Sequence, residues 1–146
     1  MAKHYDLGIA QRSANAVFGG LTRLGIGAHY RHVLTVRGRS SGAPHSTPVD
    51  VMEVGGDRWL VAPYGVVGWV KNARVVGRVE LARGGKREQF DVEEVTGEEA
   101  VPVIRAYIRD VPVTSAYWDC RADASYADLA AEVPSHPVFR LRPVAA

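Results

Sequence analysis

The stretch from Val33 to Ala62, VLTVRGRSSGAPHSTPVDVMEVGGDRWLVA, decides the fold. It holds three runs rich in β-branched and aromatic residues, which predict strands over Val33–Arg37, Thr47–Val54 and Arg58–Ala62. Polar segments with glycine separate the runs, and Gly55-Gly56-Asp57 is short enough for a tight turn. Strands joined by short turns pair antiparallel, so this stretch predicts the beginning of an antiparallel sheet.

Three further strand signals follow in the rest of the chain. Two alternating segments, around residues 79–81 and 90–92, flank Arg83-Gly84-Gly85-Lys86, whose paired glycines favour a tight hairpin. The run Val138–Arg142 alternates apolar and basic residues and predicts a strand that completes the sheet at the C-terminus.

Helix signals lie between and before the strands. Apolar spacing predicts helices over Leu7–Leu24 and Val66–Val75, and capping boxes at Thr96–Glu99 and Ser125–Asp128 predict two more helix starts. About six short strands and four helices, with hairpins in the middle, favour an α+β protein built on a small antiparallel barrel with helices around it.

Size and composition narrow the class of protein. We expect one domain over residues 1–146, with a helical region at 1–28 and the barrel with its helices at 29–146. No apolar run approaches the ~20 residues of a membrane span, so we expect a cytoplasmic protein without stable membrane insertion. The Leu7–Leu24 helix still allows peripheral contact with a membrane surface. Cys120 is the only cysteine, which excludes a disulfide framework.

Several common site motifs are missing. The chain has no Gly-x-x-x-x-Gly-Lys-Ser/Thr loop and no complete Gly-x-Gly-x-x-Gly loop. His29 and His32 stand close in sequence without a third ligand nearby, so we expect no metal site. An inert structural role is expected for Cys120.

Charge is distributed unevenly along the chain. Residues 1–48 carry six Lys or Arg against one acid, Asp6, and no carboxylate occurs from Leu7 through Val49. A one-signed field attracts ligands of opposite sign, although a solvated basic face would have the same composition. Nucleic acid is not expected as a partner, because the chain has no recognisable DNA- or RNA-reading module.

The polar segment after the first strand has the chemistry of an anion site. Gly38 and Gly42 allow backbone N–H groups to approach a ligand closely, and Ser40 and Ser41 add hydroxyl groups. A guanidinium such as that of Arg39 binds phosphate through two parallel hydrogen bonds. An ordinary turn between two strands would use the same residue types, so both interpretations stand at this point.

Residues 38–48 also resemble a family signature. Gly38-Arg39-x-Ser41-Gly42-x-Pro44-x-x-Thr47-Pro48 is similar to the signature of the deazaflavin-dependent nitroreductase family. Two later features match in order and spacing, namely Trp59-Leu60-Val61-Ala62-Pro63-Tyr64-Gly65 and Trp69-x-x-Asn72. The ending from Ala130 to Leu141 also resembles that of family members. The ordered set, spread over most of the chain, is what makes the resemblance specific.

This resemblance implies a split β-barrel of the FMN-binding, pyridoxine-phosphate-oxidase-like type. It also implies coenzyme F420, an 8-hydroxy-5-deazaflavin with a phosphate and an acidic oligoglutamate tail. Arg39, Ser40 and Ser41 would hold the phosphate, and Ala62 to Gly65 would run beside the ring. The full implied cofactor-binding set is Arg37, Arg39, Ser40, Ser41, His45, Ser46, Thr47, Pro48, Ala62, Pro63, Tyr64, Gly65, Trp69, Lys71 and Asn72.

The implied activity is hydride transfer from the reduced coenzyme to an electron-poor small molecule, namely an activated alkene, a quinone or a nitroaromatic. Tyr64 is the first candidate for the proton donor and Tyr117 the second, although plain aromatic packing would account for either ring. Ser40 and His45 replace basic residues of many relatives, so FMN stays open as the alternative cofactor. A non-catalytic cofactor carrier and a homodimer also stay open.

Overall fold

The computed structural model describes residues 30–144. The helix expected over Leu7–Leu24, and with it the region 1–28, lies outside the described residues. Within 30–144, no helix combines the length and the apolar character that crossing a bilayer requires.

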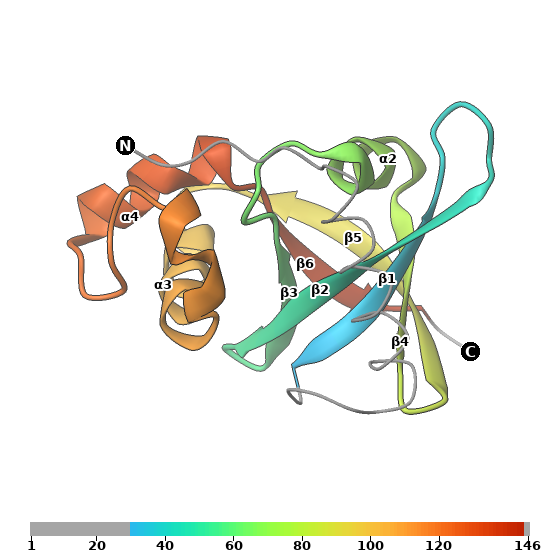
Figure 1. Cartoon of the computed structure of the whole chain (residues 1–146), viewed down its shortest axis with the longest axis horizontal. Coiled ribbons are helices and arrows are strands. Elements are labelled where there is room, and N and C mark those ends of the chain that lie inside the picture. The colour runs from blue at the N-terminus through green and yellow to red at the C-terminus, as the bar shows by residue number, and fades with distance from the viewer. Residues whose placement is uncertain (1–29, 145–146) are drawn as a thin grey trace.

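Six antiparallel strands close into a barrel in the order β1-β2-β3-β6-β5-β4, with β4 pairing back to β1 (Figure 1). This confirms the predicted small antiparallel barrel. The strands are β1 (Arg31–Arg37), β2 (Pro44–Val54), β3 (Asp57–Val61), β4 (Arg78–Arg83), β5 (Lys86–Val95) and β6 (Val138–Pro143).

Two glycine pairs make the tight turns that the sequence predicts. Gly55 and Gly56 join β2 to β3 with φ of 64° and 82°, and Gly84 and Gly85 join β4 to β5 with φ of 59° and 80°. Positive φ at both central residues is the geometry of a type I′ turn, which matches the natural twist of a hairpin. The register of four strands therefore follows from these two local choices.

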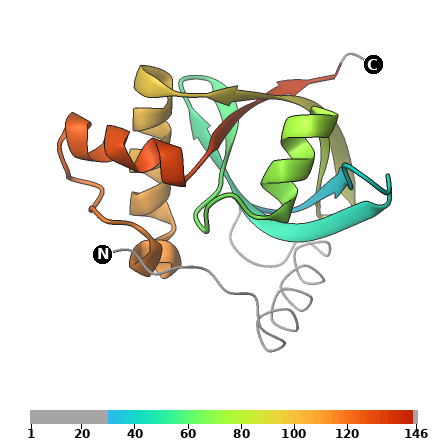
Figure 2. The same cartoon turned by 90° about the horizontal axis from the view of Figure 1, so that it is seen from above.

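The barrel interior is packed with apolar side chains. Leu34, Leu60, Phe90 and Phe139 are all at most 1% exposed and belong to one cluster. Helix α2 (Gly68–Val76) lies across one open end of the barrel and adds Val70 and Ala73 to this cluster (Figure 2). Because α2 covers this end, the barrel interior beneath it is a packed apolar core.

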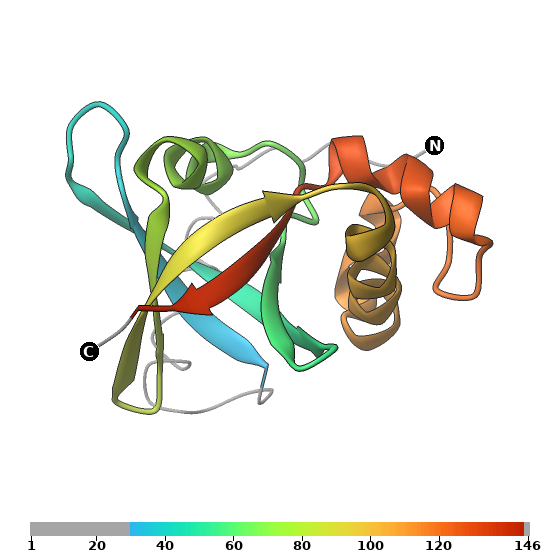
Figure 3. The ribbon, with the colours of Figure 1, turned by 180° about the vertical axis from the view of Figure 1, so that it is seen from behind.

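A second apolar cluster lies on the outside of the barrel, under the helices that follow β5. It joins Met52 and Trp59 of the sheet to Ile104 and Leu129 of the helices. Figure 3 shows these helices gathered beside one end of the barrel. The elements are η1 (Gly97–Glu99), α3 (Ala100–Asp110), η2 (Pro112–Tyr117), α4 (Tyr126–Glu132) and η3 (Val133–Ser135).

Only one of the two predicted capping boxes forms. Ser125 accepts a hydrogen bond from the Asp128 backbone N–H at 3.1 Å, as predicted. Thr96 makes no such bond, and a 3₁₀ turn precedes α3 instead. The predicted helix start is confirmed, but the Thr96 cap does not form, and the Glu99 carboxylate, the other half of the predicted box, pairs with Arg140.

Arg140 ties several elements together on the barrel surface. Its guanidinium forms ion pairs with Asp57, Glu93 and Glu99, and it stacks 4.7 Å from the Trp59 ring centroid. These contacts connect β3, β5 and η1 to β6. Many of the acids in the Glu-rich second half of the chain are thus engaged in structural pairs.

His32 is a half-buried titratable group on β1. Its Nδ1 donates to the Tyr30 carbonyl at 2.9 Å, and Arg58 Nη2 donates to its Nε2 at 3.3 Å. Burial lowers the pKa of His32 below the ordinary 6.5, and the charges of Arg58 and Arg83 lower it further. Folding therefore favours the neutral ring.

We predict that His32 makes the fold less stable in acid. The unfolded chain binds the proton more readily than the folded protein, so the free energy of unfolding falls as pH drops below about 6.5. His32→Gln keeps an acceptor for Arg58 without titrating. Urea unfolding of both proteins between pH 5 and 8 should show the wild type losing stability relative to the variant toward low pH. A difference that stays constant with pH would contradict this.

Candidate functional site

The β1–β2 loop is held in a tight shape by its own hydrogen bonds. The Gly38 N–H donates to the Ala43 carbonyl at 2.8 Å, and the Gly42 N–H donates to the Gly38 carbonyl at 3.0 Å. A Cβ at Gly38 would lie 2.9 Å from Ser41 Oγ and 3.1 Å from His45 Nε2. The exposed side chains of Ser41 and His45 therefore lie close to the bare backbone of Gly38.

Arg39 turns from this loop to helix α2. Its backbone N–H and its Nη1 both donate to Asn72 Oδ1, at 3.0 and 2.8 Å. Asn72 is 6% exposed, so its amide is a fixed anchor. The structure thus joins two predicted site residues that are 33 positions apart in sequence.

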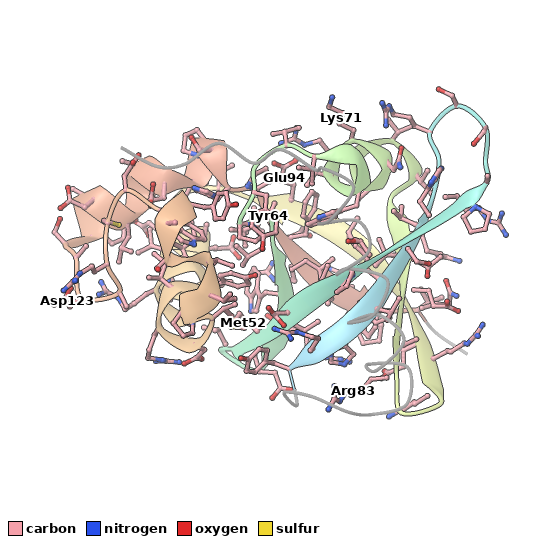
Figure 4. The ribbon with its side chains drawn as sticks, in the orientation of Figure 1. Met52, Tyr64, Lys71, Arg83, Glu94 and Asp123 are labelled. Atoms are coloured by element: carbon pink, nitrogen blue, oxygen red, sulfur yellow. The ribbon has the colours of Figure 1, made fainter. Side chains whose placement is uncertain are left out.

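The residues around this junction have the donor chemistry that an anionic group requires. Arg39 and Lys71 are exposed, and neither is paired with a carboxylate among residues 30–144. Figure 4 shows Lys71 projecting from α2 away from the barrel. The exposed hydroxyls of Ser40 and Ser41 lie on the same loop as Arg39. Two unpaired cations with hydroxyl donors and no acid fit a phosphate or carboxylate group.

Some of the predicted cofactor-binding residues on β1 and β2 point to opposite faces of the sheet, because side chains alternate along a strand. Thr47 pairs with Leu34, whose side chain is in the barrel core, whereas Ser46 pairs with Thr35 and hydrogen-bonds to it at 2.7 Å on the outer face. Arg37 is on that outer face too, where its Nη1 donates to the Gly42 carbonyl at 2.9 Å. Arg37 and Ser46 therefore do not share a face with Thr47.

Arg37 and Ser46 line a separate hollow of about 500 Å³ on the outer face of β1, β2, β4 and β5. Arg78 and Arg87 also face it, together with one acid, Glu80. Arg78 is paired with Asp91 at 3.1 Å, whereas Arg87 has no carboxylate partner within residues 30–144. The hollow is thus net basic.

The loop after β3 makes a tight turn beside α2. The Gly65 N–H donates to the Ala62 carbonyl at 3.2 Å, and Gly65 has φ of 90°. Ala62 and Pro63 are buried, and Tyr64 is partly exposed. Trp69, on the first turn of α2, packs on Phe139 with ring centroids 5.7 Å apart. This segment offers an apolar, partly open surface of the kind a planar ring needs.

Tyr64 and Tyr117 meet across this surface. Their rings pack edge to face with centroids 4.8 Å apart, and both side chains are partly exposed. Figure 4 shows Tyr64 beside the end of β3. The two candidate proton donors therefore belong to one cluster, although they are 53 positions apart in the chain. Both hydroxyl-bearing rings can border a bound small molecule.

An ion pair and a buried tyrosine near Tyr64 were not predicted as part of the site. Arg31 Nε donates to Asp50 at 3.0 Å, and the fully buried Tyr107 lies close to this pair. Burial raises the pKa of Tyr107 well above 10.0, and the charge of Asp50 raises it further, so its hydroxyl keeps its proton. The one sequence signal was a carboxylate inside the apolar run Val49–Met52, because a buried acid needs a partner.

His136 and Trp118 were also missed as site residues. The two rings stack with centroids 3.9 Å apart, and His136 Nδ1 donates to the Ala62 carbonyl at 3.1 Å. The sequence near either residue does not predict this stacking, because it depends on the path that the chain takes from α4 to β6.

The surroundings of Cys120 do not activate its thiol as a nucleophile. Burial raises the pKa of Cys120 to about 11, and the neighbouring Glu132 carboxylate adds to the shift. A thiol with such a pKa is protonated near neutral pH, which agrees with a structural role. Among residues 30–144, no cluster of three or more His, Cys, Asp or Glu is arranged to hold a metal ion.

Comparison with solved structures identifies the same barrel in other proteins. An F420-H2 dependent reductase named FDR-A is 21% identical with a TM-score of 0.54, covering 80% of this chain and 100% of that one. A putative pyridoxamine 5'-phosphate oxidase from Listeria innocua is 15% identical with a TM-score of 0.55, covering 80% of this chain and 86% of that one. A protein described as a domain-swapped dimer is 18% identical with a TM-score of 0.59, covering 91% and 96%. At these identities the likeness shows the split-barrel fold alone.

The family itself is shown by sequence. No curated protein matches the chain. A model of the F420H(2)-dependent quinone reductase family, however, matches residues 10–130, which include the β1–β2 loop, the turn after β3, α2 and Tyr117. The match spans most of the chain, so the protein is an oxidoreductase that depends on reduced coenzyme F420, and it belongs to the F420H(2)-dependent quinone reductase family.

Proposed function

We propose that this protein reduces a quinone, or another electron-poor acceptor such as an activated alkene or a nitroaromatic, at the surface between the turn after β3 and Tyr117. The observation that carries the proposal is the docking of Arg39 onto Asn72, which ties the cationic loop to α2, the helix that follows the turn bearing Tyr64. When bound, the reduced deazaflavin supplies a hydride from its ring carbon. The protein has to bind the coenzyme, orient the acceptor beside it and supply a proton to the reduced product.

The loop and α2 supply the anion-binding half of the site. Arg39 and the hydroxyls of Ser40 and Ser41 bind the phosphate, and Asn72 holds the Arg39 guanidinium in place. Charge-assisted hydrogen bonds of this kind are roughly twice as strong as those between neutral groups. The remaining contacts along the coenzyme fall to His45, Thr47, Pro48, Ala62, Pro63, Gly65, Trp69 and Lys71.

Arg37 and Ser46 have a different part because they face the outer hollow. That hollow is net basic, and Arg37 links it to the loop through the Gly42 carbonyl. We assign it to the carboxylates of the coenzyme tail. Arg87, which is exposed there, can add a second cation.

Tyr64 and Tyr117 form the acceptor side. Their edge-to-face contact leaves both rings partly exposed, so a planar acceptor can lie against them. Tyr64 is the first candidate to donate the proton that follows hydride transfer, because its turn belongs to the ring-binding segment. Quinones are the favoured class, because the matched family is defined by quinone reduction.

A homodimer and a cytoplasmic location stay predictions. One structurally similar protein is a domain-swapped dimer, which supports asking the same of this chain. The exposed side chains of Val75 on α2 and Val113 on η2, at 66% and 75%, are apolar surface that a second copy can cover.

The first test is binding and turnover. A fluorescence titration with oxidised F420 should give saturable binding, and FMN under the same conditions should bind much more weakly. The protein should then oxidise reduced F420 with a quinone faster than with an alkene or nitroaromatic acceptor. Preferential binding of FMN would show that FMN, and not F420, is the cofactor. Tight F420 binding without turnover on any acceptor would show that the protein is a cofactor carrier.

The second prediction concerns the anion site. Arg39→Ala removes a charge-assisted contact worth about 1.5–3 kcal/mol, so the Kd for F420 should rise about 10- to 150-fold. Asn72→Ala removes only the group that orients Arg39, so we expect a smaller rise. Arg109→Ala is the matched control, because it removes the same charge from an exposed pair on α3. An unchanged Kd for Arg39→Ala would remove Arg39 from the site.

The third prediction separates proton donation from packing. Tyr64→Phe keeps the ring and removes the hydroxyl, so kcat should fall about 10²-fold or more while the Kd for F420 changes little. Tyr117→Phe should have a smaller effect. Wild-type kcat in both variants would show that water delivers the proton and that the tyrosines only pack.

A further inference from the structure

His136 lies beneath the turn that carries Tyr64. The Ala62 carbonyl accepts two hydrogen bonds, one from the Gly65 N–H that closes the turn and one from His136 Nδ1. The Ala62 N–H in turn donates to the Pro137 carbonyl at 2.9 Å. Both backbone groups of Ala62 are thus held by the segment that leads into β6. The turn cannot shift without breaking these bonds.

Trp118 lies beneath Tyr117 in the same way. Its Nε1 donates to Thr114 Oγ1 at 3.2 Å, and that hydroxyl donates to the Val111 carbonyl at 2.8 Å. Trp118 is 5% exposed. The indole is therefore fixed in the η2 segment, and its chain neighbour Tyr117 is fixed with it.

The stack of His136 on Trp118 is the link between these two segments. The ring centroids are 3.9 Å apart with an interplanar angle of 29°. One face of the imidazole meets the indole, while its Nδ1–H meets the turn. Tyr64 and Tyr117 make a second, more exposed contact between the same two segments.

We infer that His136 is a positioning residue that sets the gap between Tyr64 and Tyr117, and so the geometry in which the acceptor is held. The inference rests on the proposed function of these two tyrosines. A histidine suits the position because it combines a flat ring with an N–H donor. Phenylalanine would stack without donating, and asparagine would donate without stacking. Burial lowers the pKa of His136, so the ring stacks in its neutral form near pH 7.

Two variants test the two contacts. His136→Phe keeps the stack and loses the hydrogen bond to Ala62, and His136→Asn keeps a donor and loses the stack. We expect kcat with a quinone to fall roughly 10- to 100-fold in each, as an ångström-scale misplacement does, and the acceptor KM to rise. The Kd for F420 should change less than about threefold, because Arg39 and Asn72 are untouched. His32→Gln changes a half-buried histidine on β1, away from the site, and is the control.

A measurement on the coenzyme-free protein tests the same idea without turnover. With fluorotyrosine incorporated, the ¹⁹F resonances of Tyr64 and Tyr117, assigned with the Phe variants, should shift or broaden in both His136 variants. They should be unchanged in His32→Gln. Since only the local turn is altered, this readout also serves if a variant is thermally less stable but still folded at low temperature.

The outcomes separate the two proposals. If wild-type protein binds F420 but reduces no acceptor, the proposed function fails, and unchanged ¹⁹F resonances in both variants would independently overturn the inference. If the wild type is active and both His136 variants keep its kcat and its ¹⁹F spectrum, the inference alone is wrong. A lower melting temperature with wild-type kcat would also overturn it, since that is the effect of a purely structural histidine.

Discussion

The pairing of β4 with β1 closes the barrel, and the rest of the site depends on it. In the ring of six strands, β3 and β4 are on opposite sides, with two strands between them in either direction. The chain from β3 to β4 must therefore cross the mouth of the barrel, and it crosses as α2. This crossing brings Asn72 to the loop between β1 and β2, where Arg39 meets it. The contact between the cationic loop and the helix is thus a consequence of strand order.

The segment between β5 and β6 completes the site from the other side. These two strands are neighbours in the ring, so the chain between them is free to leave the barrel and return. It leaves as η1 and α3, packs a second apolar cluster against the sheet, and returns through α4. Tyr117, at the end of η2, contacts Tyr64, and His136, just before β6, donates a hydrogen bond to the Ala62 carbonyl. The segment between β5 and β6 therefore supplies Tyr117, which contacts Tyr64, and also the stacked rings of Trp118 and His136.

Local chemistry made much of this predictable. Glycine pairs at 55–56 and 84–85 required tight turns, and alternating apolar residues required strands, so the barrel could be inferred. Strand alternation was also enough to place Ser46 and Thr47 on opposite faces, although the two were grouped together. The contacts of Arg39 with Asn72 and of His136 with Trp118 could not be inferred, because they join distant residues whose approach depends on closure of the ring. The pairing of the Glu99 carboxylate with Arg140 was not predictable for the same reason, since Arg140 lies on the distant strand β6.

Helix α2 occupies the mouth of the barrel with Val70 and Ala73, and this has a consequence for how such a protein can diversify. The filled interior maintains the scaffold, whereas the residues considered for chemistry are borne by its outer surface and loops. Exchange of an outward residue leaves the internal packing intact, so new ligand preferences can arise in this architecture without a loss of folding. Substitution of Val70 or Ala73 of α2 would instead weaken the packing of the barrel and displace Asn72 at the same time.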